Sequence, residues 1–112
     1  MIDVSMMQQN AVSAAGLLKD LSHPGRLLVL CALVTREHTV GELEELTGLG
    51  QSALSQHLAR LRDSGLVTTR REAQRIFYSI SDGKAQIMLE ALHRIYCADD
   101  TVAVDQQQGK QK

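Results

Sequence analysis

The chain has 112 residues, of which 44% are hydrophobic and 22% are charged, and its formal net charge is −1. This length fits one domain with a modest core, and this composition differs from that of the polar, highly charged chains that stay disordered. The longest apolar run covers 27–34, well short of the ~20 residues that a membrane-spanning helix requires; with no basic and apolar leader, we expect a cytoplasmic protein without membrane contact.

Apolar residues at helical spacing predict the first two helices. The first covers 10–21 and follows a flexible N-terminus over 1–9. Pro24 suits the first position of a second helix. The inward face of that helix is predicted to carry Leu27, Leu28, Cys31 and Val34.

A tight break joins the third and fourth helices. Thr39 and Glu42 match a capping box ahead of a short third helix, which Gly48 ends. Only 48–50 separate it from a fourth helix, which carries a leucine stripe and ends at Gly65. Two helices joined this closely are typical of a helix-turn-helix.

After the fourth helix, apolar residues recur at every second position, as they do in β-strands. The runs 66–71 and 75–80 are rich in β-forming residues and predict a β-hairpin. A fifth helix begins at 81–82, and apolar residues cover more than half of its circumference. The polar tail over 98–112 is expected to be disordered. The prediction is a mainly α-helical winged helix-turn-helix domain over 10–97, with five helices and a β-hairpin wing before the last.

The charges are unevenly distributed, and their distribution points to duplex DNA as a partner. Five arginines lie within 51–75, whereas 37–45 carries four glutamates and no lysine or arginine. A helix fits the major groove, and hairpin arginines reach adjacent backbone or the minor groove. We expect Ser55, Gln56 and Arg60 to face base edges. The residues expected to meet chiefly phosphates are His57, Arg62, Arg71 and Arg75.

The full set of expected DNA contacts is Gln51, Ser52, Ser55, Gln56, His57, Arg60, Arg62, Arg70, Arg71, Gln74 and Arg75. The competing interpretation is a solvated helix face beside a solvated hairpin. The tight turn, the polar outer face and the basic hairpin together favour DNA.

The first and fifth helices carry more apolar surface than a domain of this size covers, so we expect a homodimer. Its expected interface residues are Ala14, Leu17, Leu18, Met88, Leu92 and Ile95. Two recognition helices related by a two-fold axis read half-sites about one helical turn apart, which predicts an imperfect palindrome as the DNA operator. The alternative is that both helices pack within one monomer.

Several segments resemble the ArsR/SmtB family of bacterial repressors. They are LKDLSHPGRLLVLC at 18–31, VGEL at 40–43, QSALSQHLARLR at 51–62 and GLV at 65–67. Cys31, together with LHRIYC at 92–97, is similar to the BigR, SqrR and HlyU branch, which responds to sulfur species and redox state. The resemblance implies a repressor whose two cysteines lie near each other and are linked on oxidation, with a persulfide or polysulfide as inducer and no cofactor.

Cys31 and Cys97 match neither a CxxC motif nor a zinc knuckle. A cysteine on an apolar stripe is usually a small buried hydrophobe, whereas Cys97 at a helix end should be accessible. A thiolate attacks a persulfide or disulfide sulfur, and a second thiol resolves the product. A direct disulfide requires Cα atoms roughly 4.4 to 6.8 Å apart, while a polysulfide bridge tolerates a wider gap. The sequence does not choose between these two bridges.

Three other classes of function remain as alternatives. A metal-sensing repressor is one, although 40–46 lacks cysteines and the fifth helix lacks the Asp/His series of zinc sensors. Zinc needs about four ligands, and we predict no metal site, since His38 and His93 are expected to be surface or packing residues. A protein-interaction module is the second alternative. A thiol oxidoreductase is the third, but the chain lacks its motifs, so we expect no enzyme.

Overall fold

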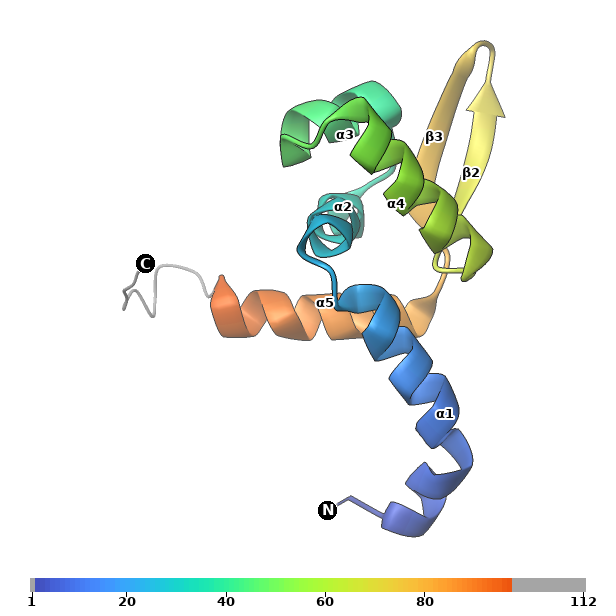
Figure 1. The fold of residues 1–112 in the computed structure, drawn as a ribbon, viewed down its shortest axis with the longest axis vertical. Helices are drawn as coiled ribbons and strands as arrows, with labels where there is room; N and C mark the ends of the chain where they lie inside the picture. Colours follow the sequence, from blue (N-terminus) through green and yellow to red (C-terminus); the bar gives the residue numbers. More distant parts are fainter. Residues whose placement is uncertain (1, 98–112) are drawn as a thin grey trace.

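The computed structural model describes residues 2–97, and within them it contains five helices and a three-stranded antiparallel sheet (Figure 1). The elements are α1 (Val4–Leu21), α2 (Pro24–Thr35), β1 (His38–Thr39), α3 (Val40–Thr47), α4 (Gln51–Asp63), β2 (Val67–Glu72), β3 (Arg75–Ile80) and α5 (Gly83–Tyr96). The predicted mainly helical fold with a β-hairpin between the fourth and fifth helices is confirmed. The tail predicted to be disordered, 98–112, lies outside the described residues.

The first helix starts earlier than predicted. It begins at Val4 rather than at residue 10, so the flexible segment expected over 1–9 is corrected to a helical one from residue 4. The reason is local, because the Asp3 carboxylate accepts hydrogen bonds from the backbone N–H groups of Ser5 at 3.0 Å and Met6 at 3.4 Å. A carboxylate in this position satisfies amides that the first helical turn leaves free.

The break between α3 and α4 has the predicted chemistry. The Thr39 hydroxyl accepts from the backbone N–H of Glu42, and the Glu42 carboxylate accepts from that of Thr39, both at 3.2 Å. Gly48 ends α3 with φ of 73°, a left-handed conformation that glycine adopts without a steric penalty. The two helices therefore meet at the tight turn that a helix-turn-helix requires.

The sheet has one more strand than predicted, in the order β1-β3-β2. In β1, His38 pairs with Tyr78 and Thr39 with Phe77 of β3. The hairpin of β2 and β3 forms the wing, and its turn places Ala73 at φ of 57°. β1 ties the wing to the segment that joins α2 to α3.

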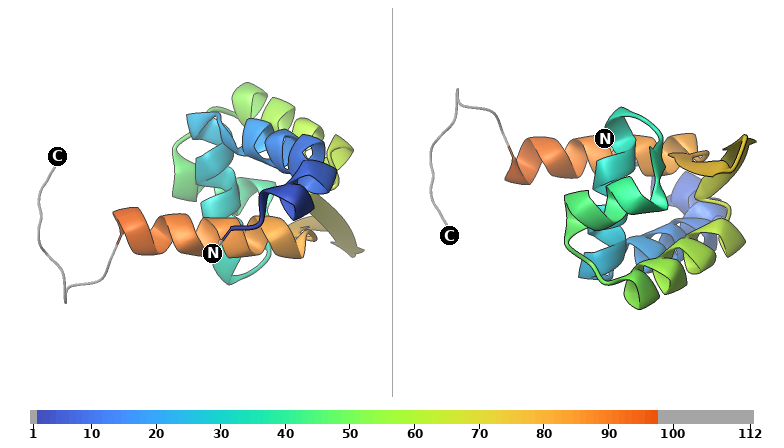
Figure 2. Two further views of the ribbon diagram at one scale, coloured as in Figure 1. Left: turned by 90° about the horizontal axis from the view of Figure 1, so that it is seen from below. Right: turned by 90° about the horizontal axis from the view of Figure 1, so that it is seen from above.

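The core lies around α2, which occupies the middle of the molecule (Figure 1). Its buried residues are Leu21, Val29, Leu30, Leu33, Leu43, Leu54, Leu58, Leu61, Leu66, Val67, Ala85 and Leu89. The C-terminal half of α5 extends past the other helices, and the wing lies near the opposite end of α5 (Figure 2). Within the described range, no helix combines the length and apolarity needed to cross a membrane.

Candidate DNA interface and thiol pair

The fourth helix divides into a buried face and an outward face. Leu54, Leu58 and Leu61 are at most 2% exposed. The outward residues are exposed and polar, and they include Gln51, Ser52, Ser55, Gln56, Arg60 and Arg62. Gly50 caps α4 without a side-chain hydrogen bond, so the amides of the first turn remain available to an anion.

Two predicted contacts on α4 already have partners within the chain. The Arg60 Nε atom lies 3.4 Å from Asp20 Oδ1, at the end of α1. His57 is half-buried, and its ring centroid lies 4.6 Å from that of His23. Burial lowers the pKa of His57, with smaller contributions from the charges of His23 and Arg26. The ring thus packs on α2. The predicted phosphate contact would require the ring to extend outward instead.

Gly25 makes this packing of the histidine ring possible. A Cβ atom at this position would lie 2.5 Å from His57 Nε2, too close for any real contact. The backbone N–H of Gly25 also donates to His23 Nδ1 at 2.9 Å, which caps α2. Residues 23–25 therefore set the distance between α2 and the recognition helix.

The wing arginines differ in what they contact. Arg70 forms ion pairs with Glu37 and Glu72. Arg71 Nε donates to the backbone oxygen of Ala73 at 3.2 Å. The exposed wing residues that the sequence predicts as DNA contacts are Arg70, Arg71, Gln74 and Arg75. Of these, Arg70 is the one held most firmly by carboxylates.

The acidic partners of Arg60 on α4 and of Arg70 in the wing are not predicted by the sequence pattern. Glu37 belongs to the acidic segment that the charge pattern shows, and Asp20 lies in the first helix. The acidic segment is the signal in the sequence that could have indicated these partners. Its pairing with the wing, however, depends on β1, which the sequence pattern does not predict. His38 at its start is 4% exposed, and its Nδ1 lies 3.0 Å from Glu42 Oε1. Hydrogen bonds from His38 and from the Thr39 backbone lower the pKa of Glu42.

Both cysteines are free thiols at the surface. Cys31 lies on α2, whereas Cys97 caps the C-terminus of α5 and donates its backbone N–H to His93 O at 2.7 Å. The surrounding protein raises the pKa of Cys31 by desolvation, and the negative charge of Cys97 raises it further. Cys31 and Cys97 thus belong to α2 and to the end of α5, two helices that pack against each other.

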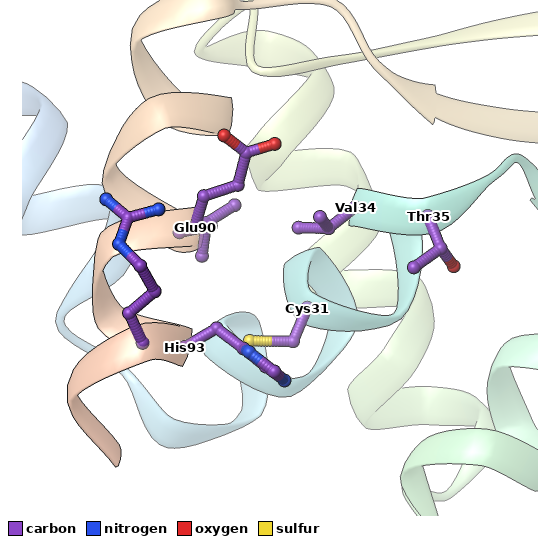
Figure 3. Close-up of a pocket in the computed structure, with 7 residues that line it drawn as sticks. Cys31, Val34, Thr35, Glu90 and His93 are labelled. Atoms are coloured by element: carbon purple, nitrogen blue, oxygen red, sulfur yellow. The ribbon is translucent and has the colours of Figure 1, made fainter. Parts of the chain in front are cut away.

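A cavity of about 330 Å³ opens beside Cys31, between α2 and α5. Its lining residues are Cys31, Val34, Thr35, Leu89, Glu90, His93 and Arg94 (Figure 3). Gln86 Nε2 donates to Glu90 Oε2 at 2.9 Å, so this carboxylate is held within its own helix. Cys31 is therefore exposed towards a partly apolar hollow rather than buried, in contrast to the expected core position on an apolar stripe.

The metal-sensing alternative needs several ligands at one place. Over residues 2–97, the structure contains no group of three or more His, Cys, Asp or Glu side chains that could hold a metal ion. The pair of histidines described above, His23 and His57, packs with tilted rings between the start of α2 and α4.

The residues predicted for a dimer interface lie on α1 and α5, at two levels of exposure. Leu18 is 53% exposed and Ile95 is 67% exposed. The half-buried residues of the set are Ala14, Leu17, Met88 and Leu92. Leu17 and Met88 also pack against the core of their own chain. The outer faces of both helices thus retain uncovered apolar side chains.

The short turn between α3 and α4, the polar outer face of α4 and the antiparallel wing define a winged helix-turn-helix DNA-binding domain. The model of the family described as "Bacterial regulatory protein, arsR family" matches residues 23–69. The Biofilm growth-associated repressor of Xylella fastidiosa (strain 9a5c) is 48% identical over 97 residues, which cover 87% of this chain and 85% of that protein.

Two further comparisons agree with this match. The Transcriptional activator HlyU of Vibrio cholerae is 48% identical over 96 residues, which cover 86% of this chain and 89% of that protein. The crystal structure of the transcriptional repressor BigR from Xylella fastidiosa matches with a TM-score of 0.82 at 47% identity, covering 88% of this chain and 100% of that chain. The chain therefore belongs to the arsR family. It is a DNA-binding transcriptional repressor of this type and not an enzyme.

Proposed function

We propose that this chain acts in the cytosol as a homodimeric repressor that leaves its operator when Cys31 and Cys97 become linked through sulfur. The observation that carries the proposal is the placement of the two cysteines, Cys31 beside a cavity between α2 and α5 and Cys97 at the C-terminal end of α5. Both thiols are exposed, so a small oxidant reaches them without unfolding of the core.

In the reduced state, the outward face of α4 enters the major groove of an imperfect palindrome. Exposed Ser55 and Gln56 face base edges there, since the glutamine amide matches the donor and acceptor pair of adenine. The other contacts that we propose are made by Gln51, Ser52, Arg62, Arg71, Gln74 and Arg75, while Arg60 moves from Asp20 to the DNA. His57 helps to position α4 from the side that faces α2, because its ring packs on α2.

Oxidation by an organic persulfide, RSSH, has a balanced chemistry with two thiols. One RSSH converts the pair into a disulfide and leaves one RSH and one hydrogen sulfide. Three RSSH molecules convert the pair into a bridge of four sulfur atoms and leave three RSH and one hydrogen sulfide. In each case one outer persulfide sulfur accepts two electrons and leaves as hydrogen sulfide, and in the second case the other two outer sulfurs become the inner atoms of the bridge.

The link acts on DNA binding through the dimer. It pulls the end of α5 towards α2, and α5 carries the exposed Ile95 on the proposed dimer face. A change in that face alters the distance between the two recognition helices, which the half-site spacing of the operator fixes. A coupling free energy of about 1 to 3 kcal/mol, a factor of ~5 to 150 in affinity, is typical of such a switch.

The test measures the affinity of the reduced protein for a duplex that it has selected from a random pool, before and after addition of an organic persulfide. We expect the wild type to weaken by a factor of ~5 to 150, and Cys31→Ser and Cys97→Ser to keep their affinity. Thr35→Ser, in the same cavity, is the matched control and should respond like the wild type. Release of a variant lacking both cysteines would contradict the proposal.

Mass spectrometry of the same samples identifies the bridge. A peptide that joins Cys31 and Cys97 with two additional sulfur atoms indicates the four-sulfur product, and one without them indicates a disulfide. Glutathione disulfide is the comparison oxidant, because it yields only the plain disulfide. Two linear peptides without a crosslink would contradict the proposed switch.

A further inference from the structure

Arg70 in the wing is held by two carboxylates. Its Nε atom lies 2.9 Å from Glu37 Oε1 and its Nη2 atom lies 2.6 Å from Glu37 Oε2. Its third nitrogen, Nη1, lies 2.9 Å from Glu72 Oε1. A guanidinium that uses its fork in this bidentate way forms the strongest kind of surface ion pair. All the nitrogen atoms of this side chain therefore have an acceptor.

The fold brings Arg70 and Glu37 together although 33 positions separate them. Arg70 pairs with Phe77 in the hairpin, and Thr39 of β1 pairs with the same residue from the other side. Glu37 directly precedes β1, so its carboxylate comes alongside the wing. The Arg70 Cζ atom also lies 4.5 Å from the centre of the Phe77 ring, which fixes the plane of the guanidinium.

The other wing arginines are held less tightly. Arg71 pairs with Ile76 and points to the opposite face of the hairpin, because side chains alternate along a strand. In the part of the chain that the structure describes, it has no ion pair. Arg75 approaches Glu42 only to 3.9 Å, and its Cζ atom lies 5.0 Å from the centre of the Phe77 ring, farther than that of Arg70. Among the described residues, neither guanidinium has a bidentate carboxylate partner, so a phosphate has less to replace at Arg71 and Arg75 than at Arg70.

The hydrogen bonds with Glu37 and Glu72 raise the pKa of Arg70, and the same contacts lower that of Glu37. The pair is therefore charged on both sides over the whole physiological range. For Arg70 to contact DNA, a phosphate would have to replace two carboxylates that already surround the guanidinium.

We propose that Arg70 is a positioning residue that fixes the wing against β1, and that Glu37 withholds its positive charge from DNA. The phosphate contacts of the wing then come from Arg71 and Arg75. This assignment replaces the expectation that Arg70 itself contacts DNA. It rests on the DNA-binding domain alone and does not depend on the thiol switch.

The salt dependence of DNA binding separates a positioning role from a contact. Each phosphate that a protein neutralises releases condensed counterions, and the slope of log K against log salt concentration changes by ~0.9 for each such contact. An arginine that remains paired with a carboxylate releases none. A variant that only disturbs the position of the wing lowers the affinity but leaves this slope unchanged.

The experiment uses the reduced full chain and a fluorescein-labelled duplex of mixed sequence, with anisotropy measured over a series of salt concentrations. Arg71→Gln is the matched control for loss of a contact, and we expect its slope to be shallower by ~0.9 per subunit. For Arg70→Gln we expect the wild-type slope. If Arg70→Gln flattens the slope as much as Arg71→Gln does, the proposal is overturned.

Two more variants test the role of Glu37. Glu37→Gln removes the bidentate partner and leaves Arg70 with Glu72 alone, so Arg70 should then reach a phosphate and steepen the slope by ~0.9 per subunit. The double variant Glu37→Gln with Arg70→Gln has the same net charge as the wild type and should return to its slope. An unchanged slope in Glu37→Gln alone would contradict the withholding of charge. Thermal unfolding of each variant shows that the domain is folded, and the result is the same whether or not the cysteines form a switch.

Discussion

The centre of the molecule and the outer faces of α1 and α5 contain the same residue types in opposite surroundings. Leu30, Leu54 and Leu61 are 0% exposed, whereas Leu18 on α1 and Ile95 on α5 are 53% and 67% exposed. Burial of apolar surface stabilises by about 25 cal/mol per Å². The residues of the centre are already buried, whereas the exposed apolar residues of the outer faces would gain this stabilisation only by packing against another surface. Helical spacing identifies the apolar face of a helix. Only the fold shows whether residues of the same chain bury that face.

The largest effect on the free energy of unfolding is expected at the fully buried residues of the centre. Leu30→Ala should lower the free energy of unfolding by about 2–5 kcal/mol, because it leaves a cavity in a packed centre. Urea unfolding at one fixed protein concentration measures this loss. Leu28→Ala on the same helix is the matched control, since Leu28 is 49% exposed. Equal losses in the two variants would break the contrast between the centre and the surface.

The second effect tests whether a second copy covers the outer faces. Leu18→Glu combined with Ile95→Glu should raise the dimer dissociation constant at least ~100-fold, or about 2.7 kcal/mol, because the dimer would bury four unpaired carboxylates. Sedimentation velocity measures the association. Val12→Glu is the control, since Val12 is 88% exposed and lies about 120° around α1 from Leu18. If the double variant associates like the wild type, these faces are not the interface.

The smallest effect is the pH dependence of stability that we expect from His57, which is half-buried next to the core. Burial, His23 and Arg26 hold its pKa below the ordinary value of 6.5, so the unfolded chain takes up a proton first as the pH falls. Stability from this group is complete above pH 6.5 and declines as the pH falls below it, because the unfolded chain then binds more protons than the folded one. Urea unfolding at about pH 7.5 and about pH 5.5 measures the decline.

The control for this pH effect is His57→Gln, which should flatten the dependence between the two pH values. Glu37 and Glu42, whose pKa values lie below the ordinary 4.5, lose their contributions only in more acidic solution. A wild-type protein that is equally stable at the two pH values would show that the ring is not shielded as described.

Local signals predicted the elements whose cause is local. The capping box of Thr39 and Glu42 and the leucine stripe of α4 need only a few neighbouring residues, and both were located from the sequence. β1 was missed because two residues carry no period, and its existence depends on pairing with β3. The Asp3 cap is not predicted, because the apolar spacing that indicates the first helix begins only at Ala11.

The candidate site was predicted in outline but not in its ion pairs. The outward face of α4 follows from the position of its leucines. Asp20 lies 40 positions from Arg60 and Glu37 lies 33 positions from Arg70, so no local sequence pattern predicts these two ion pairs. The exposure of Cys31 was also missed, because an apolar stripe does not show where the neighbouring helix α5 leaves a hollow.

The position of Cys97 at the C-terminal cap of α5 has a consequence for the rate of the proposed thiol switch. Ile95 and Tyr96 in the preceding turn are 67% and 80% exposed, and helix ends of this kind open at almost no free-energy cost. Terminal motions take nanoseconds to microseconds, far less time than thiol exchange. If the proposed thiol switch operates, we therefore expect bond formation between the cysteines, not opening of the helix end, to set the rate of the response.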